Sequence, residues 1–213
     1  NELQVGEQVK VRADFHRVVT VAEMTMYPLN NPVMYLQTLP ENEMQDAGLS
    51  AFYACRLPHA ISLRINGRID YIQQHALNGI GIQQWEVFNK DIRKQHSDLL
   101  KNLNIQTGKR LNGFYFIEAS AGYCERIPTS NERYGYYLFN RQDGFDYMGN
   151  VDLKPEKSFQ SEVHLRKEQK KLQLSLTLFY HYTANYIYSF RMDGFSQMTV
   201  GARGLKSYRN IHA

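Results

Sequence analysis

The sequence LQLSLTLFY at residues 172–180 alternates between apolar and polar side chains over most of its length. Four leucines and Tyr180 fall on one side of this segment, and mainly polar side chains fall on the other. A period of two residues is typical of a β-strand with one face in a core. Residues 162–165 precede it across a basic turn, so we predict that the two segments form an antiparallel hairpin.

The same period recurs along much of the chain. The further segments predicted as strands are residues 8–16, 18–26, 33–39, 114–119, 134–139, 145–148, 159–165, 186–192 and 195–200. Asn66-Gly67 separates two short alternating segments and predicts a hairpin turn within residues 61–71. Strands at such short intervals, without helices between them, indicate an antiparallel meander or Greek key.

Two segments have helical spacing instead. Over residues 89–103 the apolar side chains recur every three or four positions, which predicts one clear amphipathic helix capped by Asn89. Residues 41–55 carry a weaker helical pattern that predicts a second, short helix, although residues 49–57 also alternate as a strand would. The predicted fold class is therefore α+β, predominantly antiparallel β with meander or sandwich-like sheets.

The chain length of 213 residues and its mass of 24.9 kDa suit a single domain. As one compact body it would bury roughly 70% of the surface of the unfolded chain. We predict a single α+β domain over 1–213. If the chain is divided, an N-terminal half at 1–104 and a C-terminal β half at 112–200 are expected, with 201–213 as a tail.

The composition favours an ordinary folded protein. Hydrophobic residues make up 43% and charged residues 22%, which excludes disordered, collagenous and disulfide-scaffold classes. The 15 Tyr and 11 Phe stand against one Trp, and they gather after Phe114. These rings suit either a packed core or a surface that binds a partner. The candidate partner-binding residues are Tyr134, Tyr136, Tyr137, Phe139, Tyr147, Phe179, Tyr186 and Tyr188.

The net charge of +4 is only mildly basic. The densest basic run comprises Arg166, Lys167, Lys170 and Lys171, which we interpret first as a solvated turn and second as a phosphate-binding patch. No apolar run approaches the 18 residues that a membrane-spanning helix needs. We therefore predict no membrane span.

No motif for catalysis, for a metal or for a cofactor is present. The seven histidines lack the spacings of zinc sites, and the sequence contains no phosphate-binding glycine loop and no nucleophile elbow. We predict no cofactor and no metal, and we lean against an enzyme. Carboxylates that meet only in the folded chain leave a hydrolase as an alternative.

The two cysteines bear on the compartment. Cys55 and Cys124 are candidates for a disulfide, which forms in an oxidising compartment; two free thiols in a cytoplasmic protein are the alternative. The chain begins at Asn1 rather than Met, and either removal of a leader or trimming would explain this start. We take it to favour export to the periplasm or cell envelope of a bacterium.

These observations lead to a non-enzymatic binding protein of the bacterial envelope. It would engage a protein partner through an aromatic-rich β surface or a strand edge, in an immunity, secretion-accessory or assembly role. An intracellular protein that binds single-stranded nucleic acid is the alternative, because basic and aromatic side chains together suit unpaired bases. The hydrolase is the second alternative.

Overall fold

The computed structural model describes residues 7–26, 32–77, 79–87, 92–169 and 172–212. Strands account for 69% of them and helices for only 8%. The predicted α+β class is therefore wrong, since the protein is nearly all β.

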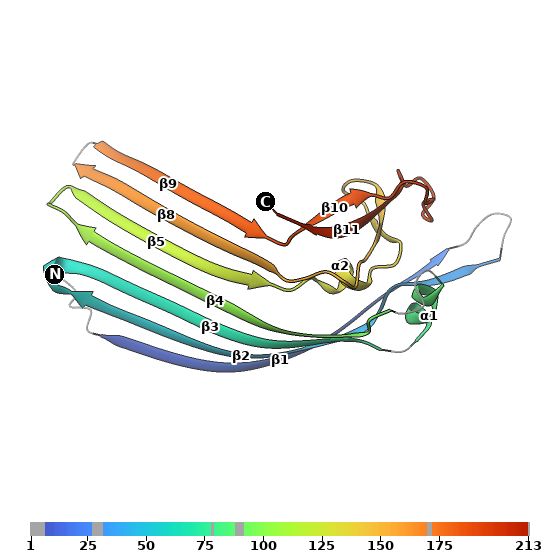
Figure 1. The fold of residues 1–213 in the computed structure, drawn as a ribbon. Helices are drawn as coiled ribbons and strands as arrows, with labels where there is room; N and C mark the ends of the chain where they lie inside the picture. The colour runs from blue at the N-terminus through green and yellow to red at the C-terminus, as the bar shows by residue number, and fades with distance from the viewer. Residues whose placement is uncertain (1–6, 27–31, 78, 88–91, 170–171, 213) are drawn as a thin grey trace.

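Seven long strands form one antiparallel sheet in simple chain order, as a meander (Figure 1). They are β1 (Gln8–Met26), β2 (Met34–Leu57), β3 (Ile61–Ala76), β4 (Gln95–Arg110), β5 (Tyr115–Arg126), β8 (Glu156–Gln169) and β9 (Leu172–Ala184). Short connections join the strands at one end of this sheet, and longer connections join them at the other (Figure 1). We call these the hairpin end and the loop end.

Two long connections and the chain after β9 carry further elements at the loop end (Figure 1). A second sheet has the order β10–β11–β7–β6, in which β11 and β7 run parallel. Its strands are β6 (Leu138–Asn140), β7 (Phe145–Met148), β10 (Tyr186–Arg191) and β11 (Leu205–Ile211). The helices α1 (Ile80–Glu86) and α2 (Ser130–Tyr134) accompany this sheet, and the short helix η1 (Pro58–Ala60) lies in a turn at the hairpin end. The C-terminal stretch predicted as a tail thus supplies β11.

The helix predicted at residues 89–103 is wrong. Asn89, its predicted cap, lies outside the described residues, and from Gln95 onward the chain forms β4. This strand pairs with β3 and β5 along most of its length. Leu99, Leu100 and Leu103 fit a helical stripe, whereas Leu103 and Ile105 alternate with polar residues as in a strand. Backbone pairing with two neighbours decided between the two periods.

The short helix predicted at residues 41–55 is also wrong, because the whole segment belongs to β2. The predicted turn at Asn66-Gly67 does not occur either, since β3 runs straight through it. Residues 195–200, predicted as a strand, form none; the backbone N–H groups of Met198 and Thr199 donate to the carboxylate of buried Asp146 instead.

The hairpin predicted from the leucine-rich segment is confirmed. Strands β8 and β9 pair in register from Lys157 and Ala184 to Gln169 and Leu172. The expectation that the leucines face a core is wrong, because the outward side chains from Leu172 to Tyr182 keep between 43% and 61% of their surface exposed. An alternating pattern indicates that the two faces of a strand differ in polarity. It does not indicate whether the apolar face contacts a protein core or another environment.

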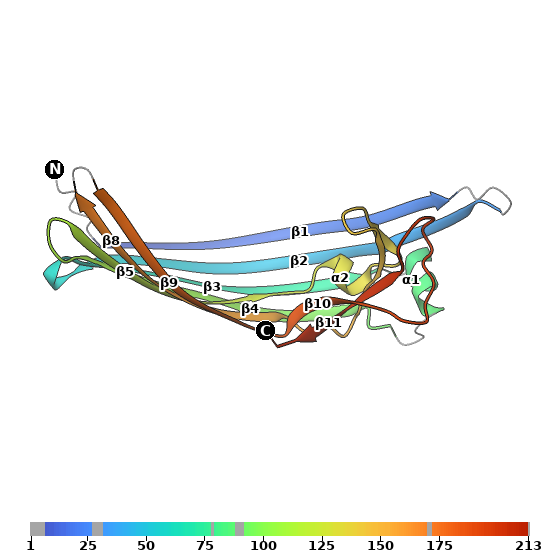
Figure 2. The same ribbon diagram turned by 90° about the horizontal axis from the view of Figure 1, so that it is seen from above.

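The buried core is confined to the loop end of the sheet. It joins side chains of β2, α1 and α2 to the second sheet, with Leu39, Trp85, Tyr134, Met148 and Leu205 among its members. The rest of the seven-stranded sheet is a single curved layer (Figure 2). The exposed surface of 14261 Å² exceeds the roughly 10,200 Å² expected for a compact monomer of this mass.

Candidate functional site

The strand registers divide the seven-stranded sheet into two chemically different faces. One cross-strand row on the first face reads Val11, Ala51, Gly67, Leu103, Tyr123, Phe159 and Tyr182. The adjacent row on the opposite face reads Lys10, Phe52, Asn66, Asn104, Gly122, Gln160 and His181. We call these the apolar face and the polar face.

The apolar side chains form a band of defined height. On β9 the outward residues from Leu172 to Tyr182 are all apolar or tyrosine, and on β3 the same holds from Ile61 to Tyr71 apart from Gly67. Each stretch covers eleven residues, or about 34 Å along the strand. At a tilt of about 45° this corresponds to roughly 24 Å, close to the apolar band of membrane β-barrels.

Polar side chains border the band toward the loop end. Arg17, Gln45, Gln73 and Ser97 form one cross-strand row on the apolar face, directly beyond Phe15, Ala47, Tyr71 and Leu99. Near this border the exposed rings of Tyr71, Tyr180 and Tyr182 stand on the same face. Rings with a polar tip suit a boundary between hydrocarbon and water.

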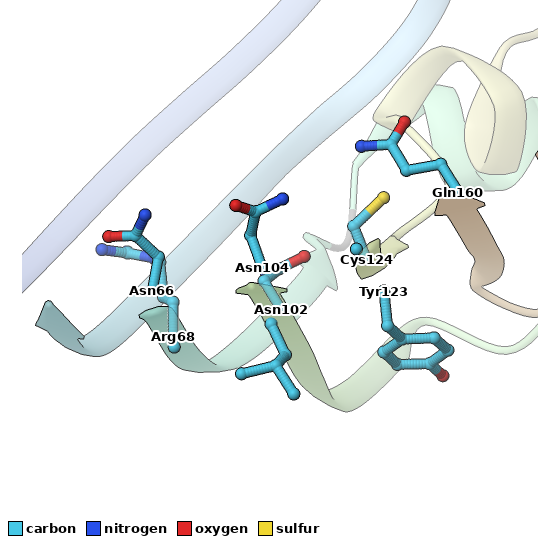
Figure 3. A pocket seen from close by; sticks show the side chains of 10 residues that line it. Asn66, Arg68, Asn102, Asn104, Tyr123, Cys124 and Gln160 are labelled. Atoms are coloured by element: carbon cyan, nitrogen blue, oxygen red, sulfur yellow. The ribbon is translucent and has the colours of Figure 1, made fainter. Parts of the chain in front are cut away.

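The polar face contains a hollow of about 150 Å³ near the middle of the sheet. Asn66, Asn104, Cys124 and Gln160 point into the same side of the sheet, whereas Tyr123 points away (Figure 3). Amide groups can both donate and accept hydrogen bonds. The hollow therefore offers a surface for a polar ligand.

A charged cluster adjoins this hollow on the polar face. The Arg68 guanidinium donates through Nη1 and Nη2 to the two carboxylate oxygens of Asp14, at 2.9 and 2.7 Å, and through Nε to Asp70 Oδ2 at 2.9 Å. Gly48 lies beneath it, and a Cβ there would come within 2.2 Å of Arg68 Nη2. Glycine at this position lets the guanidinium lie flat between the two acids.

A buried polar network attaches α2 to the polar face. Arg133, with 1% of its surface exposed, donates from Nη1 to Gln74 Oε1 at 2.7 Å and from Nη2 to Asp98 Oδ2 at 3.0 Å. Gln74 Nε2 in turn donates to Ser130 Oγ at 3.0 Å, and the Ser130 hydroxyl donates to Asn42 Oδ1 at 2.9 Å. Residues of β2, β3 and β4 thus hold the connection between β5 and β8 against the polar face of the sheet.

A second contact holds the start of α2. Thr129 caps the helix, and Glu132 completes a capping box by accepting from the Thr129 backbone N–H at 2.7 Å. Arg126 of β5 donates to Glu132 at 2.9 Å and to Glu156 of β8 at 2.7 Å. These bonds link the helix directly to neighbouring strands of the sheet.

The second sheet has its own ion pair. Lys206 Nζ donates to Asp143 Oδ2 at 2.7 Å, and the Tyr147 hydroxyl donates to the same oxygen at 2.6 Å. Burial raises the pKa of Asp143, but the hydrogen bonds from Lys206, Tyr147 and the Phe145 backbone outweigh it and lower that pKa. The Asp143 carboxylate raises the pKa of Lys206 in return.

The predicted aromatic residues do not share one surface. Tyr134, Tyr136, Tyr137 and Tyr147 are buried at the loop end, and Phe139 is half-buried. A role in binding a partner stays a prediction for exposed Phe179, Tyr186 and Tyr188.

The predicted basic patch lies in part within the described chain. Arg166 and Lys167 are in β8 at the hairpin end, whereas Lys170 and Lys171 fall outside the described residues.

The predicted disulfide does not form. Cys55 and Cys124 are both free thiols, the first buried and the second exposed. Cys55 is in β2 and Cys124 in β5, so two strands separate them. Three strand spacings amount to about 14 Å, whereas a disulfide needs Cα atoms within about 7 Å.

Within the ranges that the structure describes, no three His, Cys, Asp or Glu side chains gather into a group that could hold a metal ion. No helix in the described part of the chain is long and apolar enough to cross a membrane.

A protein-family model accounts for these two faces. The model "TonB dependent receptor-like, beta-barrel" matches residues 4–211, nearly the whole chain. The chain therefore belongs to the TonB-dependent receptor-like β-barrel family.

Solved structures show the same fold. The copper transporter OprC is 14% identical with a TM-score of 0.67, over 97% of this chain and 30% of that one. A double mutant of the Serratia marcescens hemophore receptor HasR, in complex with its hemophore HasA and heme, is 14% identical with a TM-score of 0.56, over 96% and 36%. The siderophore receptor PirA from Pseudomonas aeruginosa is 10% identical with a TM-score of 0.50, over 97% and 45%. No curated protein matches the chain.

This chain spans less than half the length of each of these receptors. Two predictions are confirmed. They are the location in a bacterial cell envelope and the predominance of β-sheet. The predicted immunity role is wrong, because the family is one of receptors. The sequence analysis did not identify this β-barrel family, although apolar alternation over eleven residues in Leu172–Tyr182 was a signal for it.

Proposed function

We propose that the seven-stranded sheet is part of the wall of an outer-membrane receptor, with its apolar face toward lipid and its polar face toward the interior. The apolar band of roughly 24 Å on the exposed face carries this proposal. A water-soluble sheet would cover leucines such as Leu176 and Leu178 with a second layer, yet they are 54% and 61% exposed. Lipid supplies the missing layer.

The proposal also accounts for the sheet edges. Among the described strands, β1 and β9 each pair on one side only. Unpaired backbone groups in hydrocarbon cost several kcal/mol each, so a wall in lipid needs these edges closed by further strands. Closure into a barrel would place the hollow of Asn66, Asn104 and Gln160 on the inner surface.

We further propose that the receptor takes up a ligand that carries a metal. The similar structures are a copper transporter, a hemophore receptor in complex with its hemophore and heme, and a siderophore receptor. The amide side chains that line the hollow on the polar face suit a polar ligand during passage, because amides both donate and accept hydrogen bonds. A partner protein would deliver this ligand, as a hemophore accompanies heme in the similar complex.

Labelling of single cysteines in isolated outer membranes tests the orientation of the wall. With Cys55 and Cys124 both replaced by serine, Leu176→Cys places a thiol on the apolar face and Ser175→Cys places one on the polar face. A membrane-impermeant maleimide should label the Ser175→Cys protein and leave the Leu176→Cys protein unmodified. Equal labelling of the two thiols would contradict a wall in lipid.

A charge placed near the middle of the band gives an energetic test. Leu176→Arg should destabilise the protein folded in phosphatidylcholine vesicles by about 2–4 kcal/mol, since lipid-facing arginine at the midplane costs this much. Ser175→Arg is the matched control on the polar face and should cost less than 1 kcal/mol. Similar losses for the two variants would argue against the assignment of faces.

Uptake by cells tests the ligand. A strain that lacks the gene should lose accumulation of copper, heme iron or iron from ferric siderophores, when each is supplied alone and cell metal is measured. Restoring the full gene should restore the same uptake. Unchanged accumulation from all of these sources would reject a metal-bearing ligand while leaving the wall intact.

A further inference from the structure

Lys167 is a cation on the apolar face, at the end of β8 near the hairpin end. It faces outward from β8 between Tyr115 of β5 and Leu174 of β9. Its Nζ lies 5.3 Å from the centre of the Tyr115 ring, and its stem is half-buried. This arrangement keeps the ammonium at the hairpin-end border of the band, as expected of a lysine that extends from apolar surroundings toward a polar layer.

Lys109 repeats this arrangement two strands away. It faces outward from β4 between Ile61 of β3 and Ile117 of β5. Neither Lys109 nor Lys167 forms an ion pair with a described residue. Their cross-strand neighbours on the apolar face include no carboxylate, whereas Arg17 at the opposite border pairs with Glu43 at 2.7 Å. Lys109 and Lys167 therefore carry positive charge without a counterion among the described residues.

An apolar hollow of about 280 Å³ lies beside Lys167. Its lining includes Leu111, Leu165, Leu174 and Leu176 together with Tyr115 and Lys167. The hollow is thus apolar over the leucines and cationic at its border. A molecule with a hydrocarbon chain and an anionic head would match both parts.

We propose that this hollow binds one anionic glycerophospholipid, with an acyl chain against the leucines and its phosphate near Lys109 and Lys167. The inference rests on the proposed outer-membrane wall. The short connections at this end, such as residues 111–114, mark the periplasmic side of a bacterial barrel, and so place the site in the phospholipid leaflet. The phosphate supplies the missing counterion.

Lipid titration of the full protein in neutral detergent tests the site. Dioctanoyl-phosphatidylglycerol is added, and native mass spectrometry gives the dissociation constant. Lys109→Gln and Lys167→Gln should each raise this constant about fivefold, and the double variant about 25-fold, since a basic residue near anionic lipid contributes about 1 kcal/mol. The variant that carries both Lys109→Arg and Lys167→Arg keeps the two positive charges and should bind with the dissociation constant of wild type.

The matched control removes two charges from the same end of the opposite face. Lys10→Gln with Arg64→Gln should leave the dissociation constant within twofold of wild type, because both side chains are on the polar face. Dioctanoyl-phosphatidylcholine should bind wild type more weakly than phosphatidylglycerol does, and its dissociation constant should be the same for all of these variants. Three results would overturn the inference. The two lipids could bind equally well, or wild type and the Lys109/Lys167 double variant could have equal affinity. Lipid A could also displace phosphatidylglycerol where other anionic lipids do not.

Insertion into phosphatidylcholine vesicles separates this inference from the proposed function. Wild type and the Lys109→Gln, Lys167→Gln protein should both insert and resist added protease. Failure of both proteins to insert would count against the receptor wall itself. Insertion of both without a preference for phosphatidylglycerol would reject only the lipid site.

Discussion

Replacing Arg133 by methionine should release α2 from the wall. Methionine retains much of the side-chain length, but it removes the donors that reach Gln74 Oε1 and the Asp98 carboxylate. Gln74 is 1% exposed, so water cannot replace the lost donor there. The consequence is a buried acceptor without a partner and a carboxylate without its cation.

The expected loss can be estimated from these contacts. A buried acceptor without its donor costs about 1–3 kcal/mol, and breaking a buried ion pair costs about 3–5 kcal/mol. The Asp98 side chain remains 20% exposed and recovers some hydration, which favours the lower part of this range. We expect Arg133→Met to reduce the free energy of unfolding by about 3 kcal/mol.

Guanidinium unfolding in detergent micelles measures this loss through Trp85, the one tryptophan of the chain. Its indole N–H donates to the Tyr134 carbonyl at 2.8 Å, so its fluorescence reports directly on α2. Exposed Arg141 provides the control, and Arg141→Met should change stability by less than 0.5 kcal/mol. A loss below 1 kcal/mol for Arg133→Met, or equal losses for the two variants, would refute the reasoning.

Two further predictions concern the polar face and the second sheet. Gly48→Ala should cost about 1–3 kcal/mol because the new methyl displaces the Arg68 guanidinium, whereas Gly67→Ala, with nothing within 4 Å, should be neutral in the same unfolding assay. The lowered pKa of Asp143 means that its pairing with Lys206 stabilises the fold fully above the ordinary aspartate range and is lost as pH falls through the lowered pKa. Lys206→Met should therefore weaken the loss of stability below pH 4, and an unchanged acid profile would contradict this.

The alternating pattern located several strands, although it failed to show that β3 runs unbroken through Asn66-Gly67. The predicted segments 8–16 and 18–26 together cover β1, residues 114–119 cover only the first half of β5, and residues 172–180 cover most of β9. The predicted pairing of β8 with β9 is confirmed. Prediction failed in β4, where Leu100 breaks the alternation and gives the apolar residues a helical spacing as well. The bonds to β3 and β5 resolve that ambiguity, and they come from segments distant in sequence.

The candidate sites could be foreseen less well than the strands. The hollow on the polar face brings Asn66, Asn104, Cys124 and Gln160 together from four strands, and no local motif announces such a row. Cys55 and Cys124 looked like a natural pair, yet strand order separates them. Cys124, Arg166 and Lys167 were singled out from the sequence and also line one of the two hollows, but the sequence suggested other roles for them.

The sequence by itself determined that most of this chain would be extended and two-faced, because side chains project alternately from a strand. It could not determine which face is exposed, since alternation is the same whether leucines meet a protein core or lipid. The tertiary structure decided this by spreading seven strands into one curved layer, with its core only at the loop end. A single layer has no second sheet to cover Leu172–Tyr182, so the face that reads as a core becomes an outer surface.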